Sequence, residues 1–225
     1  MSDTAIIKAE ALSIIRDGST ILDKITTRIS KGKITMLLGH NGAGKSLLLQ
    51  ALHGIIAPDG GTITAPPALT QKMVFQKPIL LRRSASRHFD FLCPEISRAE
   101  KITWFERAGL SDQMDIPARQ LSGGEQQKLA FIGALASKPD LLFLDEPAAN
   151  LDFEASAKIE ALIEHAIKEG TTIIMTTHNM AQAHRLADHV LFIDHGKLIE
   201  DRPAKDFFAN PLHDAAKAYI AHHRT

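Results

Sequence analysis

The sequence predicts an α/β protein, with a mostly parallel sheet, an N-terminal antiparallel β region and an inserted helical region. In the second half of the chain, short apolar runs alternate with segments of helical pattern, which is typical of right-handed βαβ crossovers. Near the N-terminus, apolar and polar residues alternate instead, as in half-buried strands. Between these regions, prolines punctuate helical patterns. We expect one domain over 1–225, with a core of about 1–76 and 136–225 and a helical subdomain of about 77–135.

The N-terminal part predicts a hairpin followed by a buried strand and a helix. Asp17 and Gly18 separate two β-prone runs, which is a common hairpin signal. The segment "ITTRIS" (25–30) alternates as a half-buried strand does, and "ITMLL" (34–38) is a continuous apolar run typical of a strand buried on both faces. A helix is expected from about Lys45 to Leu52.

The second half predicts three more strands and the helices between them. The expected elements are strands at 141–144, 171–177 and 190–193, with helices at 153–168 and 180–187. For the tail, Asn210 is expected to cap a helix that has Pro211 at its first position.

Charge and composition exclude several classes of protein. The chain has 26 basic and 26 acidic residues among 225, and this balance argues against nucleic acid as the main partner. Cys93 is the only cysteine, so no intrachain disulfide forms and a reducing compartment is expected. No signal peptide and no uncharged apolar run of membrane-spanning length is visible. We expect a cytoplasmic protein that reaches a membrane only through a partner.

The segment "GHNGAGKS" (39–46) follows the buried strand and precedes a helix, which is the context that the G-x-x-x-x-G-K-[ST] phosphate loop requires. Glycines let backbone N–H groups converge on phosphates, and the helix N-terminus adds its positive dipole end. Lys45 is expected to reach the β- and γ-phosphates, and Ser46 to offer an oxygen to Mg²⁺. The nucleotide is expected to contact Gly39, His40, Asn41, Gly42, Ala43, Gly44, Lys45, Ser46 and Leu47. The fold is therefore expected to be a P-loop (RecA-like) one that binds a nucleoside triphosphate.

Two carboxylates, Asp145 and Glu146, follow the apolar run "LLFL" (141–144). In an open parallel sheet, ligands bind beyond the carboxyl ends of the strands. Asp145 is therefore expected to hold Mg²⁺, and Glu146 to orient a water for in-line attack on the γ-phosphate. A lone acidic pair at a strand end is commonplace and often only solvated, but here it accompanies a phosphate loop.

The segment "LSGGE" (121–125) predicts a helix N-terminus that meets an anion. Ser122 and Glu125 satisfy a capping box, but a cap alone does not explain the adjacent glycines Gly123 and Gly124. An anion docked on the helix end needs bare backbone and free N–H donors. A triphosphate at 39–46 already has its own loop, so this helix end is expected to meet a nucleotide held by another copy.

These motifs, in this order and together with His178, resemble the nucleotide-binding subunit of ABC transporters over essentially the whole chain. The resemblance implies ATP hydrolysis by a homodimer that clamps two ATP and their Mg²⁺. It implies that Gln76 is the Q-loop residue that senses the γ-phosphate and the metal, and that Asp152, in "ANLD", lies at the subunit interface. It implies that His178 contacts the γ-phosphate. The implied catalytic groups are Glu146, His178, Gln76 and Lys45, and the implied metal ligands are Ser46, Gln76 and Asp145.

The chain departs from this family's pattern at three places. The aromatic residue that often stacks on adenine is replaced by Arg16 or its neighbour Ile15, and a guanidinium either stacks on a base or is simply solvated. Leu47 replaces a threonine and offers no hydroxyl to the α-phosphate. Gly133 replaces a common arginine. None of these changes removes a group that holds Mg²⁺ or orients water, so an active ATPase is expected.

The kind of transporter is an indirect inference from the segments "HGIIAPDGG", "MVFQKPILLRRS" and "RLADHVLFIDHGKLIEDRPAKDFFANP". They resemble most the ATPases of tungstate-type oxyanion importers, which implies a membrane permease and, indirectly, a solute-binding protein as partners. The basic run 77–88 either faces that permease, attracts anionic lipid or is solvated. An exporter subunit and a non-transport ABC ATPase stay as alternatives, and a GTPase is disfavoured because no N-K-x-D motif is present.

Overall fold

The computed structural model describes residues 4–149 and 151–223. A small antiparallel sheet has the order β2-β1-β4, with β1 (Ala5–Arg16), β2 (Ser19–Ser30) and β4 (Gly60–Thr64). The predicted hairpin joins β1 to β2, and both of its turn residues, Asp17 and Gly18, have positive φ (49° and 75°). Two positive φ angles match the right-handed twist of the flanking strands, which is why the Asp-Gly pair marks this turn.

The larger sheet has six strands in the order β5-β6-β7-β3-β8-β9. The strands are β5 (Gln71–Val74), β6 (Leu141–Leu144), β7 (Thr172–Thr176), β3 (Ile34–Leu38), β8 (His189–Asp194) and β9 (Lys197–Pro203). All neighbours pair in parallel except β8 and β9, which are antiparallel. Every residue of β3, β6 and β7 is buried, so their apolar runs are uninterrupted because both faces of this sheet are covered.

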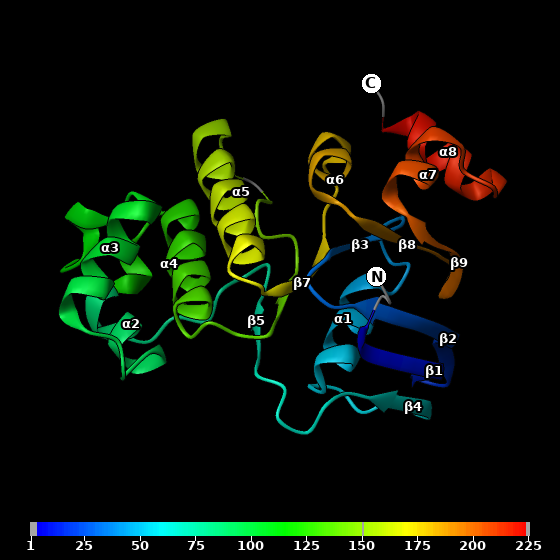
Figure 1. The fold of residues 1–225 in the computed structure, drawn as a ribbon, viewed down its shortest axis with the longest axis horizontal. Helices are drawn as coiled ribbons and strands as arrows, with labels where there is room; N and C mark the ends of the chain where they lie inside the picture. The colour runs from blue at the N-terminus through cyan, green and yellow to red at the C-terminus, as the bar shows by residue number, and fades with distance from the viewer. Residues whose placement is uncertain (1–3, 150, 224–225) are drawn as a thin grey trace.

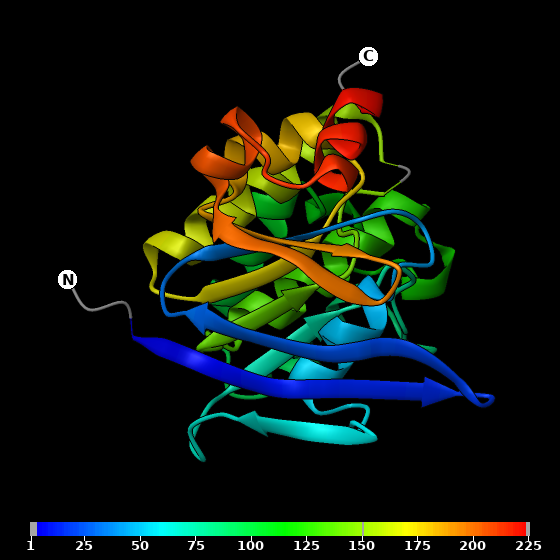
Figure 2. The same ribbon diagram turned by 90° about the vertical axis from the view of Figure 1, so that its right-hand side faces the viewer.

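Alternate residues of the six-stranded sheet enter two separate apolar cores. On one face, residues such as Met36, Leu144 and Met175 pack with α5 (Phe153–Lys168), α6 (Met180–Leu186), α7 (Ala204–Ala209) and α8 (Asp214–His222). On the other face, residues such as Leu37 and Phe143 pack with α1 (Lys45–His53) and the small sheet. Figures 1 and 2 show these layers, with α5 to α8 on one side of the large sheet and α1 with β1, β2 and β4 on the other.

The inserted region contains α2 (Ala85–Leu92), α3 (Arg98–Ala108) and α4 (Gly123–Ala136), with short 3₁₀ turns at Ser111–Gln113 and Ala118–Gln120. It lies beside α5 and away from the small sheet (Figure 1). Gly133 is explained by this packing, because a Cβ there would lie 2.6 Å from Cδ1 of Leu92 on α2. The Cys93 thiol also donates to the Gly133 carbonyl at 3.1 Å. A larger side chain at this position would have to displace Leu92.

The predicted start of the tail helix is wrong. Asn210 ends α7 as its C-cap, and α8 begins only at Asp214, with His213 as its N-cap. The cause is the buried Glu200, whose Oε1 accepts hydrogen bonds from the backbone N–H groups of Leu212 and His213, both at 2.8 Å. These bonds hold the chain around Pro211 in a connection between two helices. Over the described residues, no helix is both long and apolar enough to cross a lipid bilayer.

Candidate functional site

The predicted phosphate-loop, catalytic and metal-binding residues gather at one edge of the large sheet. The phosphate loop follows β3, Gln76 lies just beyond β5, the pair Asp145 and Glu146 follows β6, and His178 lies just beyond β7. Because these four strands are parallel and adjacent in the order β5-β6-β7-β3, their carboxyl ends meet at the same edge. The topology thus brings together residues that are far apart in the sequence.

The phosphate loop is shaped by close backbone approach at its first and last glycines. A Cβ at Gly39 would collide with the Ile193 carbonyl oxygen, and one at Gly44 would lie 2.5 Å from Cδ2 of Leu22. Gly44 is also the N-cap of α1 and supplies no side-chain hydrogen bond. The first N–H groups of α1 are therefore left for an anion, which a helix N-terminus favours.

Lys45 lies inside the loop rather than in solvent. Its Nζ donates to the carbonyls of Gly39 at 2.8 Å and His40 at 3.0 Å, and the residue is only 7% exposed. Burial lowers the pKa of Lys45, while the negative charges of Glu146 and Asp145 raise it. His40, Asn41, Gly42 and Ser46 are exposed along the loop, Gly44 and Leu47 are half-buried, and Ala43 is buried.

Asp145 is joined to Ser46 across the site. Its Oδ1 accepts hydrogen bonds from Ser46 Oγ at 3.0 Å and from Thr176 Oγ1 at 2.8 Å. Asp145 is 7% exposed, so this carboxylate is held in one position. A carboxylate oxygen beside hydroxyl oxygens is the donor set that Mg²⁺ prefers, and these residues therefore fit that ion.

Glu146 is held between Gln76 and His178. Its Oε2 accepts from Gln76 Nε2 at 2.9 Å, and its Oε1 lies 2.7 Å from His178 Nε2. The backbone at Glu146 has a φ of 48°, and its N–H donates to Thr176 Oγ1 at 2.9 Å. A left-handed conformation at a non-glycine residue costs about 1–3 kcal/mol and is retained where the surroundings enforce it. Here it places the carboxylate beside the amide and the imidazole.

Sequence reasoning missed Thr176, which holds both carboxylate residues. Its hydroxyl contacts the side chain of Asp145 and the backbone of Glu146. The available signal was its place at the end of the run "TTIIMT", beside the acidic pair on the neighbouring strand.

The signature "LSGGE" forms the predicted capping box at the start of α4. Ser122 Oγ accepts from the Glu125 backbone, and Glu125 Oε2 accepts from the Ser122 backbone at 2.8 Å and from its hydroxyl at 2.8 Å. A Cβ at Gly124 would lie 3.3 Å from Leu151 Cδ2. Packing against Leu151 within the chain is therefore one reason for a glycine at this position. A Cβ at Gly123 would meet nothing within 4 Å. The fold of this chain therefore gives no steric reason for Gly123.

A hollow of about 350 Å³ lies beside this signature, between the N-terminal ends of α4 and α5. Its lining residues are Ser122, Gly124, Glu125, Lys128, Leu151, Asp152, Glu154, Ala155 and Lys158. Asp152 is the N-cap of α5, and its Oδ1 accepts from Ala155 N–H at 2.7 Å. The phosphate loop, which is fully described, contributes nothing to this lining. Of the "ANLD" segment, Asn150 lies outside the described residues.

Arg16 is paired with Asp59, which lies just before β4, rather than with the phosphate loop. Its Nη1 donates to the Ile15 carbonyl at 2.6 Å and lies 3.4 Å from Asp59 Oδ2, and 42% of its side chain is exposed. Asp59 Oδ2 also accepts from the Ile15 N–H at 2.7 Å. Ile15 is 45% exposed, so both residues near the expected adenine position are accessible.

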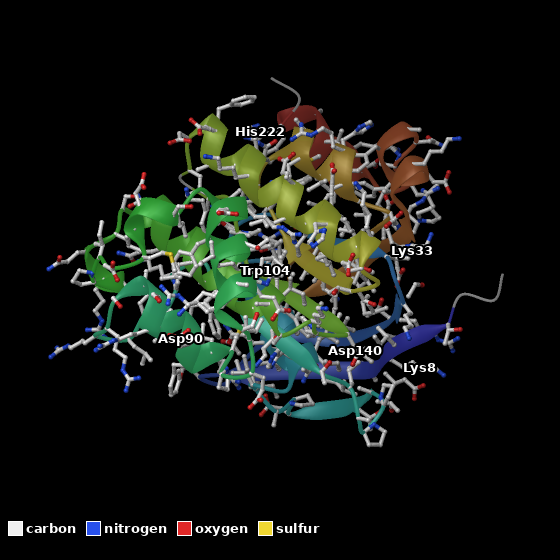
Figure 3. All side chains as sticks on the ribbon, turned by 60° about the vertical axis from the view of Figure 1, so that its left-hand side comes forward. Lys8, Lys33, Asp90, Trp104, Asp140 and His222 are labelled. Atoms are coloured by element: carbon white, nitrogen blue, oxygen red, sulfur yellow. The ribbon has the colours of Figure 1, made fainter. Side chains whose placement is uncertain are left out.

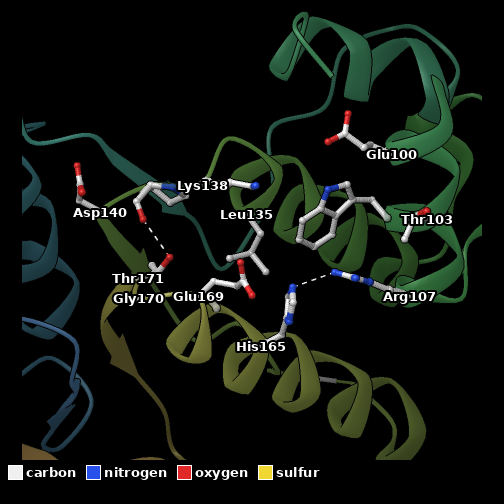
Figure 4. A pocket seen from close by; sticks show the side chains of 13 residues that line it. Glu100, Thr103, Arg107, Leu135, Lys138, Asp140, His165, Glu169, Gly170 and Thr171 are labelled. Atoms are coloured by element: carbon white, nitrogen blue, oxygen red, sulfur yellow. Dashed lines mark hydrogen bonds between the residues drawn. The ribbon is translucent and has the colours of Figure 1, made fainter. Parts of the chain in front are cut away.

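A second hollow, of about 360 Å³, lies at the opposite edge of the sheet, where β6 and β7 begin (Figure 4). It lies between the helical insert and α5, and Figure 3 labels two of its lining residues, Trp104 and Asp140. Arg107 lies over the Trp104 ring and is hydrogen-bonded to His165 Nε2 at 2.8 Å. This hollow is remote from the phosphate loop, so it does not belong to the nucleotide site.

The fold and the phosphate-loop edge together define the class of P-loop nucleoside triphosphatases. The profile of the family described as "ABC transporter" matches residues 22–149. The chain belongs to this family as an ATP-binding subunit, and it is an ATPase coupled to transport.

Individual relatives cover most of the chain. It is 30% identical over 222 residues to the "Glutamine transport ATP-binding protein GlnQ" of Bacillus subtilis, with 89% of this chain and 92% of that protein covered. It is 33% identical over 230 residues to the "Phosphate import ATP-binding protein PstB" of Pyrobaculum aerophilum, with 89% of this chain and 91% of that protein covered. The structure of cbiO1 from Clostridium perfringens, described as part of the ABC transporter complex cbiONQ, has a TM-score of 0.78 and 30% identity, with 92% and 91% covered. None of these three is named for tungstate.

Proposed function

We propose that this ATPase powers the import of an oxyanion, tungstate in particular, through a membrane permease that it serves from the cytoplasmic face. The support is the resemblance of the segments around 53–61, 73–84 and 185–211 to tungstate-type importers. The similarity to a phosphate importer is compatible with an oxyanion. The similarity to a glutamine transport protein supports the alternative, which is an importer of another small solute. An exporter subunit is the remaining alternative.

In this proposal the nucleotide's phosphates lie on the backbone of 39–46, at the N-terminus of α1. Lys45 moves no proton; it supplies a positive charge to the β- and γ-phosphates, and the neighbouring carboxylates offset part of the burial that lowers its pKa. Leu47 contacts the nucleotide only through its backbone and apolar side chain. Arg16 faces the adenine with its guanidinium plane, next to Asp59.

Ser46, Asp145 and Gln76 are the residues proposed to hold Mg²⁺. When bound, this ion neutralises charge on the phosphate oxygens. Asp145 is preoriented for this role by Thr176, whose hydroxyl bonds to its Oδ1. Gln76 lies just beyond β5 and so links the metal position to the helical insert that follows it.

The observation that carries the proposed chemistry is the position of Glu146 between Gln76 and His178. Its carboxylate accepts a proton from the water that attacks the γ-phosphate in line, and the P–O bond to the leaving ADP breaks. Gln76 orients the carboxylate, and His178 contacts the γ-phosphate from the same side. Gln76 and His178 thus hold the Glu146 carboxylate through side-chain contacts alone.

Ser122, Gly123, Gly124 and Glu125 are proposed to complete the site of a second copy, with Asp152 at the interface. The open space around Gly123 supports this arrangement, because bare backbone there lets an anion approach closely. In this proposal the helical subdomain, 77–135, carries the signature, and the rest of the chain forms the nucleotide-binding core.

The permease is proposed to dock on the helical insert. Ile79 is 80% exposed and Phe91 is 60% exposed, and the Arg83 guanidinium lies 5.9 Å from the Phe91 ring centroid. Arg83, Arg87, Asp90 and Phe91 line a shallow hollow of about 540 Å³. An apolar segment with an acidic residue fits this surface, whereas anionic lipid would engage only the arginines. Nucleic acid is not proposed as a partner, because the net charge is zero.

The substrate is tested by titrating the solute-binding protein of this transporter with tungstate, molybdate, sulfate and phosphate. The proposal expects tungstate to bind most tightly and, in the assembled transporter, to stimulate ATP hydrolysis. Tight binding of an amino acid, with none of these oxyanions bound, would replace tungstate with the amino acid alternative. The absence of any cognate binding protein would favour an exporter.

A further inference from the structure

The position of His178 depends on the short loop that joins β7 to α6. His178 lies in this loop, and 37% of its side chain is exposed. Its ring pairs with Glu146 Oε1 at 2.7 Å. Because so much of the imidazole is open to the site, the direction in which it points is set mainly by the backbone of residues 177–179.

The buried hydroxyl of Thr177 holds this backbone. Thr177 is 5% exposed, and its Oγ1 accepts a hydrogen bond from the Asn179 N–H at 3.1 Å, on the other side of His178. The same hydroxyl donates to Oε1 of Gln182 at 2.7 Å. Asn179 in turn is the N-cap of α6, and its Oδ1 accepts from the Gln182 N–H at 3.0 Å. A hydroxyl that accepts one bond and donates another is fixed in direction, so the loop is held on both sides of His178.

Gln182 ties the same loop to α5. It lies on α6, is only 1% exposed, and its Nε2 donates to Oε1 of Glu160 at 3.1 Å. Glu160 belongs to α5, and its two carboxylate oxygens also accept from Nη2 of Arg185, at 2.7 and 2.8 Å. An ionised carboxylate only accepts, so the amide turns its NH₂ group toward Glu160 and its oxygen toward Thr177. The acid on α5 therefore determines the direction of every bond that reaches the loop.

We propose that Gln182 is a positioning residue for His178. It holds the Thr177 hydroxyl, and through it the loop 177–179, where the imidazole meets Glu146. An apolar side chain in place of Gln182 would leave the buried Thr177 hydroxyl without its acceptor and would free the loop from α5. The expected effect is on hydrolysis rather than on ATP binding, because the phosphate loop makes none of these bonds. This inference rests on the proposed contact of His178 with the γ-phosphate.

The first test compares Thr177→Val with Thr171→Val, at opposite ends of β7. Thr171 is also buried, and its hydroxyl donates to the Pro139 carbonyl at 3.0 Å, at the sheet edge remote from the phosphate loop. Both variants lose a buried hydrogen bond, so both melting temperatures should fall by about 2–4 °C. Only Thr177→Val is expected to lower kcat for ATP hydrolysis, by about 3- to 30-fold with KM unchanged. Thr177→Ser keeps the hydroxyl and should restore kcat.

The second test is a double-mutant cycle that asks whether Gln182 acts through the imidazole. Single-turnover ATP hydrolysis is measured for Gln182→Leu, for His178→Ala and for the variant that carries both changes, each in the whole protein. Gln182→Leu alone should slow hydrolysis about 3- to 30-fold, but it should cause no further loss beside His178→Ala.

Three results would overturn this inference. The first is an equal loss from Gln182→Leu with and without His178, and the second is an equal fall of kcat in Thr171→Val and Thr177→Val. The third is wild-type turnover by both Gln182→Leu and Thr177→Val while His178→Ala is slow. Wild-type turnover by His178→Ala would instead contradict the proposed role of His178, and this inference with it.

Discussion

The phosphate-loop edge and the signature at the start of α4 differ in how fully their polar groups are used within this chain. At the loop edge, Lys45 bonds to two carbonyls, Asp145 to two hydroxyls and Glu146 to Gln76 and His178. Every one of these groups has a partner, as buried polar groups require.

The signature end is instead only partly explained by contacts within its own chain. The capping box uses Ser122 and Glu125, but Gly123 faces open space. The buried Lys128 forms no hydrogen bond or ion pair with the described residues, and the charges of Glu125, Glu154 and Asp152 offset only part of the effect of its burial. Burial lowers the pKa of Lys128, as does the charge of Lys158. The difference supports the proposal that one chain builds the loop edge, whereas the signature receives a group supplied by a second copy.

The strongest test of the proposed chemistry at the phosphate-loop edge is the substitution Glu146→Gln. We expect hydrolysis to fall about 10²- to 10⁴-fold because the water loses its base, while ATP binding persists. An ATP-bound closed dimer should then accumulate. Phosphate release and size-exclusion chromatography with light scattering measure the two effects. Glu164→Gln, on an exposed position of α5, is the matched control and should hydrolyse ATP normally. Wild-type turnover by Glu146→Gln would rule out Glu146 as the general base.

The proposed contact between the signature and a nucleotide of a second copy is tested by the substitution Ser122→Arg. We expect hydrolysis to fall at least about 100-fold, because a large cation fills the space meant for a nucleotide phosphate and a hydroxyl donor is lost. ATP binding to the isolated monomer should stay nearly normal. The measurement is ATPase activity beside ATP titration under monomeric conditions.

Loss of the cap alone must be separated from loss of the trans contact. Ser97 provides the control, since Ser97 and Glu100 form the same capping box at the start of α3. Ser97→Arg should cost about 0.5–2 kcal/mol of stability and leave hydrolysis at working temperature intact. If Ser122→Arg also abolished ATP binding by the monomer, the second-copy arrangement would be wrong.

A smaller change, Gly123→Ala, sharpens the same contrast. Open space around Gly123 and the higher helix propensity of alanine predict unchanged or slightly higher stability. A Cβ at a point of close phosphate approach predicts about a 10-fold loss of hydrolysis. Stability is measured by urea denaturation and activity by phosphate release. Full activity in Gly123→Ala would leave the glycine unexplained and would remove the main support for an anion at this position.

Local sequence signals predicted the fold closely, because each strand and turn has its own signature. The hairpin at Asp17, the continuous strands β3 and β6 and the capping box at Ser122 are all set by residues adjacent in the chain. The tail helix was predicted, but its start at Asn210 was wrong because the deciding group, Glu200, lies ten residues earlier and acts through its side chain. Contacts of that kind leave no periodic pattern.

The candidate site divides in the same way. Lys45, Asp145, Glu146 and His178 were predicted because motifs of fixed spacing carry them. Tyr219 of α8, whose ring lies 5.1 Å from the His40 ring, was missed, because it reaches the loop through the packing of α8 and carries no motif. Thr176 belongs to the same class, since its hydroxyl matters only through the neighbouring strand.

The smallest expected effect concerns Arg16, which belongs neither to the phosphate-loop edge nor to the signature. Its ion pair with Asp59 is half-exposed, and such pairs contribute about 0–1 kcal/mol, so Arg16→Ala should hardly change stability. If the guanidinium stacks on adenine, ATP affinity should fall about 2- to 5-fold while affinity for inorganic triphosphate stays constant. Arg16→Trp should restore ATP binding, because an indole offers the same planar contact. Asp59→Asn is the control for the ion pair alone. An equal loss for ATP and triphosphate would place the effect on the phosphates and exclude adenine stacking.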